Sequence, residues 1–168
     1  MSPSSEFGHR DRLLILDTGV IREIVTFRAV DEFHFERMRT DLKFIKDQRG
    51  YEACTLFFGQ FRRKTTTASM VAELHYWLRA TDQNGLLHLW DIVYSEFQRL
   101  TMDEEVIKLL NMNLNLVARS SLGPVDVSLI EIARRHSAEG ALILTVDSEL
   151  YEECRRAALS AKHLSEIV

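Results

Sequence analysis

The sequence predicts an α/β fold in which helices cover a mostly parallel β-sheet. Two short, almost wholly apolar runs, residues 13–16 and 141–146, are each followed by an aspartate. Such runs are typical of strands that are buried on both faces, as in a parallel sheet. Segments with the spacing of amphipathic helices separate the runs. Alternating strands and helices indicate an α/β layer fold.

Three further segments are predicted strands. Residues 65–70 are rich in β-branched side chains and are expected to form a strand that runs into a helix. Residues 162–168 are expected to form a last strand at one edge of the sheet. Residues 97–101 are a weaker candidate for a strand.

Helical periodicity predicts three helices in the second half of the chain. Apolar residues recur every three or four positions from Val106 to Val117, and the acids at 103–105 favour a helix N-terminus before them. Gly123-Pro124 then breaks the chain, and proline is favoured in the first turn of the helix expected to follow. Residues 148–159 are expected to form another helix.

Length and composition indicate one globular unit. The chain has 168 residues, of which 46% are hydrophobic and 27% charged, and its formal net charge is −4. Because domains typically have about 100–200 residues, we expect a single domain over residues 13–168, preceded by a flexible tail over residues 1–12. The acidic balance argues against nucleic-acid binding through overall charge, although a local basic patch is compatible with it.

Cysteine usage and hydropathy predict a cytoplasmic protein without a membrane segment. Cys54 and Cys154 stand a hundred positions apart and belong to no metal-binding motif, so a reducing compartment fits best. The longest apolar runs are far shorter than a bilayer span. The polar start of the chain lacks the apolar core of a secretion signal.

Residues 31–64 are predicted to be an inserted helical hairpin. Two apolar stripes at helical spacing, one from Phe35 to Ile45 and one from Ala53 to Phe61, indicate two helices separated near Gly50. Six of the nine phenylalanines lie in this region. Their number exceeds what one hairpin needs, so the hairpin is also a candidate surface for a homodimer or a partner.

Four acids are expected at one edge of the sheet. Asp17 and Asp147 follow the two apolar strands, and Glu73 and Asp126 lie near the starts of predicted helices. Strand C-termini and the N-termini of the following helices share one edge of a parallel sheet. Two carboxylates 4 Å apart repel by about 4 kcal/mol at an effective dielectric near 20. Such a group therefore requires protonation or a bound cation.

Carboxylates without histidine or cysteine select hard cations, Mg²⁺ or Mn²⁺. Such a centre suits the hydrolysis of phosphodiester bonds. Arg62, Arg63 and Lys64 lead into the strand before Glu73 and are candidates for contact with RNA phosphates.

The acids also carry a resemblance to a known family. The chain resembles the PIN-domain ribonucleases from about residue 13 to its end, because four motifs occur in that family's order. They are Leu16-Asp17-Thr18, Ser69-x-x-x-Glu73-Leu74, Gly123-Pro124-x-Asp126-x-x-Leu129-Ile130-x-x-Ala133 and Thr145-x-Asp147-x-x-Leu150.

The resemblance implies a three-layer α/β/α fold and a metal-dependent endoribonuclease that binds Mg²⁺ or Mn²⁺. Carried over by position, Asp17, Glu73, Asp126 and Asp147 are the metal-site acids. Thr18 and Thr145 are supporting hydroxyls. Many small PIN proteins are toxins of toxin–antitoxin pairs, in which an antitoxin peptide covers the pocket. This chain departs from the compact toxins, since residues 31–64 are inserted between Asp17 and Glu73.

The sequence lacks the motifs of several other hydrolase classes. A phosphatase of the haloacid dehalogenase type needs a second aspartate two residues after the first, where this chain has Gly19. The glycine-rich phosphate loops and the Gly-x-Ser-x-Gly motif of hydrolases are absent from the sequence. The alternative to a nuclease is a catalytically idle module that binds RNA or a protein through residues 31–64. The sequence does not separate a toxin from an RNA-processing enzyme.

Overall fold

The computed structural model describes residues 12–81, 86–107 and 121–168. Five strands form one sheet in the order β3-β2-β1-β4-β5, and every pairing is parallel. This arrangement confirms the predicted parallel sheet. The strands are β1 (Leu13–Leu16), β2 (Arg63–Thr67), β3 (Met102–Glu105), β4 (Leu142–Thr145) and β5 (Ser160–His163).

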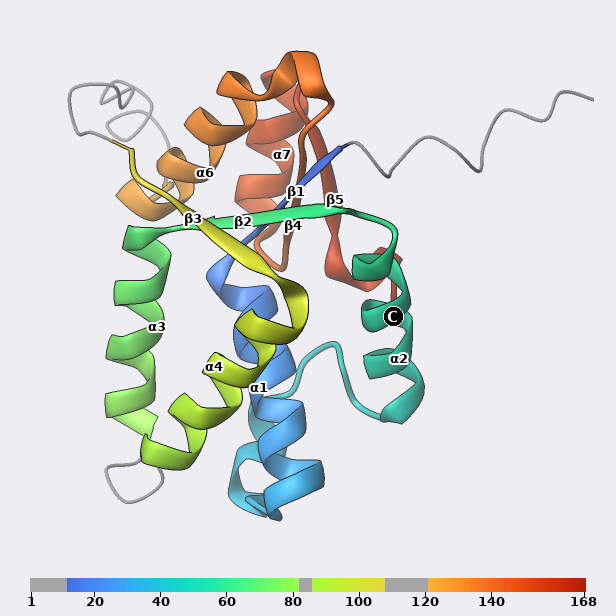
Figure 1. The fold of residues 1–168 in the computed structure, drawn as a ribbon, viewed down its shortest axis with the longest axis vertical. Helices are drawn as coiled ribbons and strands as arrows, with labels where there is room; N and C mark the ends of the chain where they lie inside the picture. Colours follow the sequence, from blue (N-terminus) through green and yellow to red (C-terminus); the bar gives the residue numbers. More distant parts are fainter. Residues whose placement is uncertain (1–11, 82–85, 108–120) are drawn as a thin grey trace, which may run out of the picture.

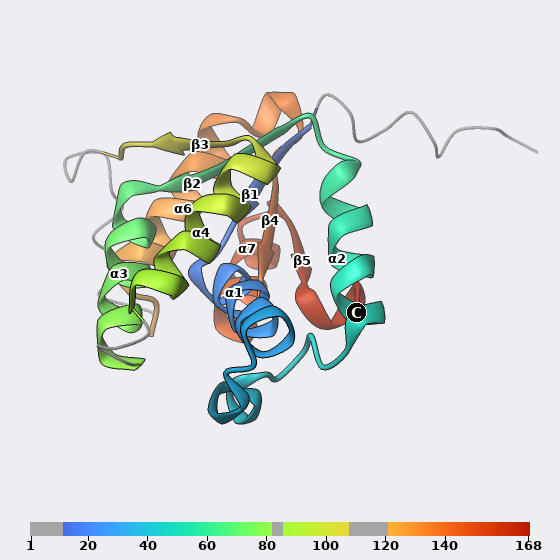
Figure 2. The same cartoon turned by 60° about the horizontal axis from the view of Figure 1, so that its bottom comes forward.

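Helices cover both faces of the sheet, so the predicted three-layer α/β/α architecture is confirmed (Figures 1 and 2). Helices α1 to α4 lie on one side, and α6 and α7 lie on the other. The α-helices are α1 (Thr18–Phe33), α2 (Gln48–Gly59), α3 (Ala68–Thr81), α4 (Leu86–Leu100), α6 (Pro124–Arg135) and α7 (Ser148–Arg156). Short 3-10 helices are η1 (Glu36–Asp41), η3 (Ser137–Glu139) and η4 (Leu164–Glu166).

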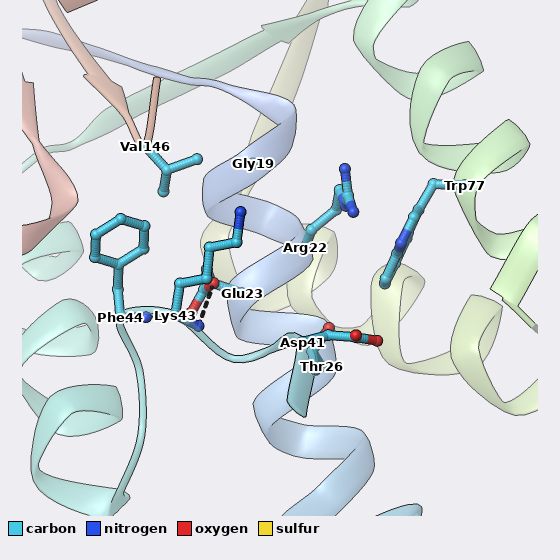
Figure 3. Close-up of a pocket in the computed structure, with 9 residues that line it drawn as sticks. All are labelled: Gly19, Arg22, Glu23, Thr26, Asp41, Lys43, Phe44, Trp77 and Val146. Atoms are coloured by element: carbon cyan, nitrogen blue, oxygen red, sulfur yellow. Dashed lines mark hydrogen bonds between the residues drawn. The ribbon is translucent and has the colours of Figure 1, made fainter. Parts of the chain in front are cut away.

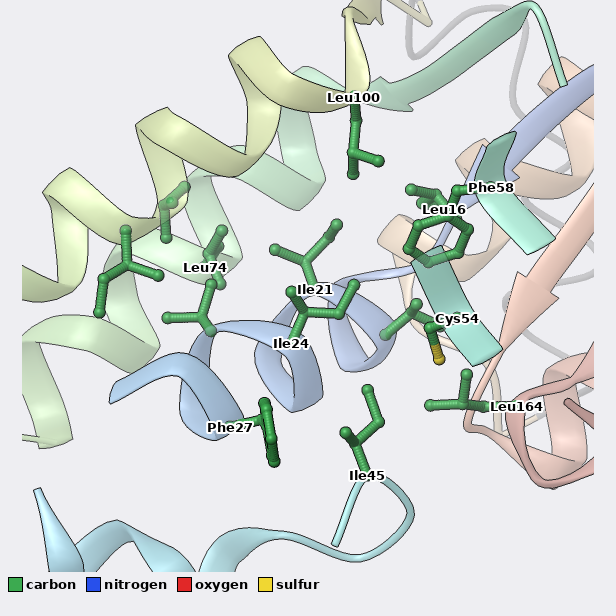
Figure 4. Packing of buried hydrophobic residues seen from close by; sticks show 14 of the residues in the cluster. Leu16, Ile21, Ile24, Phe27, Ile45, Cys54, Phe58, Leu74, Leu100 and Leu164 are labelled. Atoms are coloured by element: carbon green, nitrogen blue, oxygen red, sulfur yellow. The ribbon is translucent and has the colours of Figure 1, made fainter. Parts of the chain in front are cut away.

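The position of strand β1 between two helical layers explains why its sequence is apolar throughout. Its four residues are buried, and because successive side chains of a strand alternate between faces, they divide between two cores. Leu14 and Leu16 pack with α1 to α4, whereas Leu13 and Ile15 pack with α6 and α7. Figure 4 shows the larger core, in which Ile21 and Ile24 of α1 lie at the centre.

The strand order places a crevice at the end of β1. The chain winds from β1 to β2 and β3 in one direction, and β4 and β5 then add on the other side of β1. The carboxyl ends of β1 and β4 therefore form a topological switch point, where ligands of open α/β sheets usually bind.

Some predicted element boundaries were wrong. Residues 97–101 are not a strand, because 97–100 complete helix α4 and Thr101 adopts a left-handed backbone conformation, with φ 52°. The acids at 103–105, predicted to lie at a helix N-terminus, form part of edge strand β3. The predicted helix over 106–117 lies mostly outside the described residues. The predicted last edge strand is present, but it starts at Ser160 and ends at His163.

The segment 31–64 contains one α-helix of its own instead of the predicted hairpin. Helix α1 continues to Phe33, and His34 ends it in the left-handed conformation. The first predicted helix of the hairpin is wrong, because the 3-10 helix η1 and irregular backbone with bends occupy that stretch. Gly50 does not separate two helices; it lies in the first turn of α2, where its N–H donates to Asp47, the N-cap.

Glu23 explains why the stretch after η1 is not helical. Its side chain on α1 is buried, and its carboxylate accepts hydrogen bonds from the backbone N–H groups of Lys43, Phe44 and Ile45, at 2.9–3.0 Å. These N–H groups are thereby satisfied without a helix. The apolar pattern that resembled a helical stripe instead places Met38, Leu42 and Ile45 in the core.

We expect Glu23→Ala to lower the free energy of unfolding by about 3 kcal/mol, because three backbone donors lose a charged acceptor. Urea unfolding measures this change. Glu36→Ala is the matched control, since the Glu36–Arg39 pair is exposed and its loss should cost less than about 1 kcal/mol. Equal effects of the two substitutions would contradict the anchoring role of Glu23.

The phenylalanines of this segment serve mainly the core. Phe58 and Phe61 are buried, and Phe35, Phe44 and Phe57 pack against the same core, whereas Phe33 is 42% exposed. The surplus that suggested a homodimer or partner surface is therefore largely used within the fold. The homodimer stays a prediction.

Both cysteines are free, as the sequence predicted, and both are buried. Burial raises the pKa of each thiol to about 12, so neither is reactive near neutral pH. None of the described helices combines the length and the apolar character needed to cross a bilayer. The predicted flexible tail lies outside the described residues except for Arg12, whose guanidinium donates to the carbonyl of Gly140.

Candidate active site

Asp17 lies directly after β1, at the N-cap position of α1, and its side chain is buried. Its carboxylate makes no capping bond. Instead, Oδ2 accepts a hydrogen bond from the Thr145 hydroxyl at the end of β4, at 2.7 Å. A Cβ added to the next-but-one residue, Gly19, would lie 2.1 Å from Cγ2 of Val146. Glycine therefore lets α1 approach the end of β4 closely at this point.

Glu73 lies beside Asp17, at the exposed rim of the site. It is in the second turn of α3, one turn further along than the sequence predicted. The Thr18 hydroxyl donates to Glu73 Oε2 at 2.7 Å, and this bond ties the start of α1 to α3. Both threonines that the sequence singled out therefore donate to acids of the predicted set.

Asp126 occupies the predicted first turn of α6 and is half-buried. Its Oδ2 accepts the backbone N–H of Gly123 at 2.9 Å. One turn of α6 is also joined to β2, because the buried Ser128 hydroxyl lies 3.3 Å from Thr67 Oγ1. These contacts hold Asp126 at the carboxyl edge of the sheet.

Asp147 is the N-cap of α7. Its Oδ1 accepts the N–H groups of Glu149 and Leu150, as expected of a capping aspartate. Its own N–H donates to Thr145 Oγ1, the same hydroxyl that donates to Asp17. Thr145 thus links the two acids at the ends of β1 and β4.

The four acids share one electrostatic environment. Burial, and to a smaller extent the charges of Asp17, Asp147 and Glu73, raise the pKa of Asp126 to about 6 against the lowering effect of the hydrogen bond from Gly123. The pKa of Asp17 is raised mainly by burial and also by Glu73, against the hydrogen bond from Thr145. The structure therefore brings all four predicted acids to one edge of the sheet.

The donor chemistry of this edge fits a hard divalent cation, since carboxylate and hydroxyl oxygens converge in a partly buried setting. In this structure, the side chains are not arranged as a complete set of metal ligands. Among the residues that the structure describes, no three acid, histidine or cysteine side chains are gathered closely enough to hold a metal ion. Metal binding requires the carboxylates to draw together.

The structure places the predicted RNA-contact residues at the other edge of the sheet. Arg63 and Lys64 are in the first half of β2, at the amino ends of the strands. Arg63 pairs with Glu139, and Lys64 is buried with Nζ donating to the Phe61 carbonyl at 2.8 Å. Arg62 precedes the same strand. This placement gives no support to a contact between these residues and RNA at the acidic edge.

A group that the sequence interpretation missed lies next to the acids. Arg22 on α1 stacks over the Trp77 ring of α3, with its guanidinium carbon 4.8 Å from the ring centroid. Four-residue spacing is the signal that could have found it, since Thr18 and Arg22 lie on one face of α1, and Glu73 and Trp77 lie on one face of α3.

Comparisons with known proteins identify the fold and no more. No family model matches the sequence, and no curated protein matches it. A domain of a functionally unknown protein from Methanocaldococcus jannaschii superposes with a TM-score of 0.47 at 13% identity, over 90% of each chain. VapBC2 from Rickettsia felis, solved bound to a DNA fragment from its promoter, gives a TM-score of 0.52 at 13% identity. That match covers 90% of this chain and 98% of the other.

The similarity to VapBC2, a toxin–antitoxin complex with a PIN domain, supports a PIN-like fold for this chain. At such low identity it concerns the arrangement of the backbone alone. The assignment of the four acids to a function therefore depends on their chemistry and geometry.

Proposed function

We propose that the protein is an endoribonuclease that depends on Mg²⁺ or Mn²⁺ and uses the four acids at the carboxyl ends of β1 and β4. The observation that carries this proposal is the placement of Asp17, Glu73, Asp126 and Asp147 at one edge of the sheet, where their charges act on one another. The charges of the other three acids raise the pKa of Asp126, in addition to the larger effect of its burial. A divalent cation would relieve this repulsion.

Each of the four acids would have a distinct role in binding the metal ion. Asp17 and Glu73 would be the principal metal ligands, because Thr145 and Thr18 fix one oxygen of each. Asp126 would complete the set from the opposite helix layer. Asp147 has one oxygen engaged as the cap of α7, so its other oxygen is the one left for the site. A bound ion would supply charge stabilisation at the phosphate and acidify the attacking water.

The partner that this proposal suggests is an antitoxin. VapBC2 is a toxin–antitoxin complex, and a similar backbone supports a toxin role for this chain. Expression of the protein alone should then arrest growth, and co-expression of its antitoxin should restore it. Unimpaired growth would favour an RNA-processing enzyme that acts without an antitoxin.

Removal of metal tests the proposed activity. We expect EDTA to abolish cleavage of single-stranded RNA by the purified protein, and excess Mn²⁺ to restore it, because the carboxylates alone cannot stabilise the charge of the phosphate. Gel analysis of labelled RNA measures this. EDTA already saturated with Mn²⁺ is the control and should leave cleavage unchanged. Absence of cleavage at every metal concentration would favour the alternative, an idle module that binds RNA or protein through residues 31–64.

A further inference from the structure

A pocket of about 200 Å³ opens beside the acidic site (Figure 3). Gly19 and Val146 form the wall that adjoins Asp17 and Thr145. Arg22 of α1 and Trp77 of α3 form a second side, and Lys43 and Phe44, which follow η1, form a third. The inserted segment therefore contributes directly to the surroundings of the acids.

The pocket lies one helical turn below the acids. Helices α1 and α3 meet in two successive contacts: Thr18 with Glu73, and Arg22 with Trp77 four residues further along each helix. One turn of an α-helix advances 5.4 Å. Because even a stacked strand rises ~3.4 Å per nucleotide, this offset corresponds to about one nucleotide along a bound chain.

Two cations reach into the pocket without a carboxylate partner. Arg22 and Lys43 are exposed, and neither forms an ion pair with another described residue. Figure 3 shows the Lys43 side chain pointing toward Val146 and the Arg22 guanidinium standing beside Trp77. Stacking on Trp77 holds the Arg22 guanidinium there, and the Glu23 carboxylate fixes Lys43 through its backbone N–H.

Acids in the pocket do not cancel these cations directly. Glu23 is occupied by three backbone N–H groups of residues 43–45. Asp41, the other acid of the lining, is exposed. A ligand that suits the pocket therefore carries an anionic group for Arg22 and Lys43 and polar donors for Asp41.

We propose that this pocket binds the nucleotide adjacent to the bond that is cleaved. Its phosphate would contact Arg22 and Lys43, and its base would lie between Phe44 and the stacked Arg22–Trp77 pair. The inference rests on the proposed ribonuclease function and specifies where the substrate chain runs. Asp41, Lys43 and Phe44, which the inserted segment supplies, become part of the substrate site.

The size and walls of the pocket favour a nucleotide over a larger ligand. Sites for drug-sized molecules usually enclose about 300–1,000 Å³, so 200 Å³ suits a single base-sized group. Unpaired RNA bases commonly stack on aromatic rings or on guanidinium planes, and both surfaces are present here. The amino groups of RNA bases can donate hydrogen bonds to the Asp41 carboxylate.

The salt dependence of RNA binding tests the phosphate contacts. A labelled single-stranded oligoribonucleotide would be titrated in EDTA with Asp17→Asn protein, so that binding is measured without cleavage. We expect Arg22→Gln/Lys43→Gln to flatten the slope of log K against log salt by about 0.7, since each phosphate neutralised on a single strand contributes about 0.7 and the two cations share one phosphate. Lys46→Gln/Arg79→Gln, which removes two exposed cations outside the pocket, should leave the slope unchanged. An equal slope in the pocket variant and its parent would overturn the proposal.

Trp77 tests the base contact. We expect Trp77→Ala to weaken RNA binding by about 5- to 150-fold, equivalent to the 1–3 kcal/mol of one base stacked on an aromatic ring. Trp77→Phe should retain most of the affinity, which separates stacking from loss of structure. Undiminished affinity of Trp77→Ala would overturn this part of the proposal.

Competition identifies the source of the ligand. A nucleoside 5′-monophosphate should displace RNA from the parent protein at lower concentration than inorganic phosphate, and this advantage should vanish in Trp77→Ala. Equal competition by phosphate would contradict a base subsite. Because these assays contain no metal, pocket-dependent binding stands even if the protein does not cleave RNA. Conversely, metal-dependent cleavage with full RNA affinity in the pocket variants would refute the subsite and leave the nuclease intact.

Discussion

The Asp17→Asn variant should lose RNA cleavage by about 10³-fold or more. Charge stabilisation by a catalytic cation contributes several kcal/mol, and each 1.36 kcal/mol is a factor of ten in rate. Asp17 is the most buried acid of the site, and Thr145 already orients its Oδ2. Replacing the carboxylate with an amide keeps the shape of the side chain and removes the charge that a cation requires. Single-turnover cleavage of labelled RNA in Mn²⁺ measures the loss.

The same variant should be more stable than its parent in EDTA at neutral pH. Burial raises the pKa of Asp17, so the folded protein holds its charged form at a cost that the amide does not incur. A rise in melting temperature together with the loss of cleavage would separate catalysis from folding. Asp31→Asn, an exposed position on the same helix, is the control and should change neither quantity. Full cleavage by Asp17→Asn would contradict the proposed role of the acid.

The stability of the protein should depend on the ionisation of Asp126. Its pKa is raised to about 6, first by burial and then by the neighbouring acids. A raised pKa means that the folded state favours the neutral acid, so this group lowers stability as the pH rises from about 4 through 6. We expect Asp126→Asn to be about 1–2 kcal/mol more stable than the parent at pH 7.5, after allowance for solvent at the half-buried carboxyl.

The difference should disappear near pH 4, where the parent carboxyl is protonated and closely resembles the amide. Urea unfolding in EDTA at both pH values measures it. Asp91→Asn, at an exposed position of α4, should change the free energy of unfolding by less than about 0.5 kcal/mol at either pH. An equal difference between Asp126→Asn and its parent at both pH values would show that ionisation of Asp126 does not lower the stability of the fold.

The central strands were predictable because burial on both faces of the sheet requires continuous apolar sequence. Leu13–Leu16 is apolar at every position, since both faces of β1 are covered. The Gly123-Pro124 pair also correctly predicted the start of α6. Edge strand β3 was not, because its acids at 103–105 resemble a helix N-terminus and only pairing with β2 makes them a strand.

Residues 34–47 show where local patterns fail. Their apolar positions have helical spacing, but a distant side chain decides the backbone conformation. Glu23 binds three successive N–H groups there, and such a tertiary contact leaves no periodic signal. The basic run at 62–64 was similarly misleading, since Lys64 is buried at the opposite edge of the sheet.

The candidate site was largely predictable because strand ends and helix starts share an edge in any parallel α/β sheet. Asp17, Asp126 and Asp147 could be placed from their elements alone. The roles of Thr18 and Thr145 came from family resemblance. In the structure, the Thr18 hydroxyl donates to Glu73 and the Thr145 hydroxyl donates to Asp17. The stacking of Arg22 on Trp77 was missed, because it follows from the four-residue spacing only once α1 is known to pack on α3.

Calorimetric titration with Mn²⁺ at pH 7.5 tests most directly whether the four carboxylates form one metal centre. We predict that the protein binds Mn²⁺ at submillimolar concentration, and that Asp17→Asn and Asp126→Asn each weaken this binding at least tenfold, with Asp31→Asn unaffected. No detectable binding up to millimolar Mn²⁺, or equal binding by all four proteins, would contradict the account.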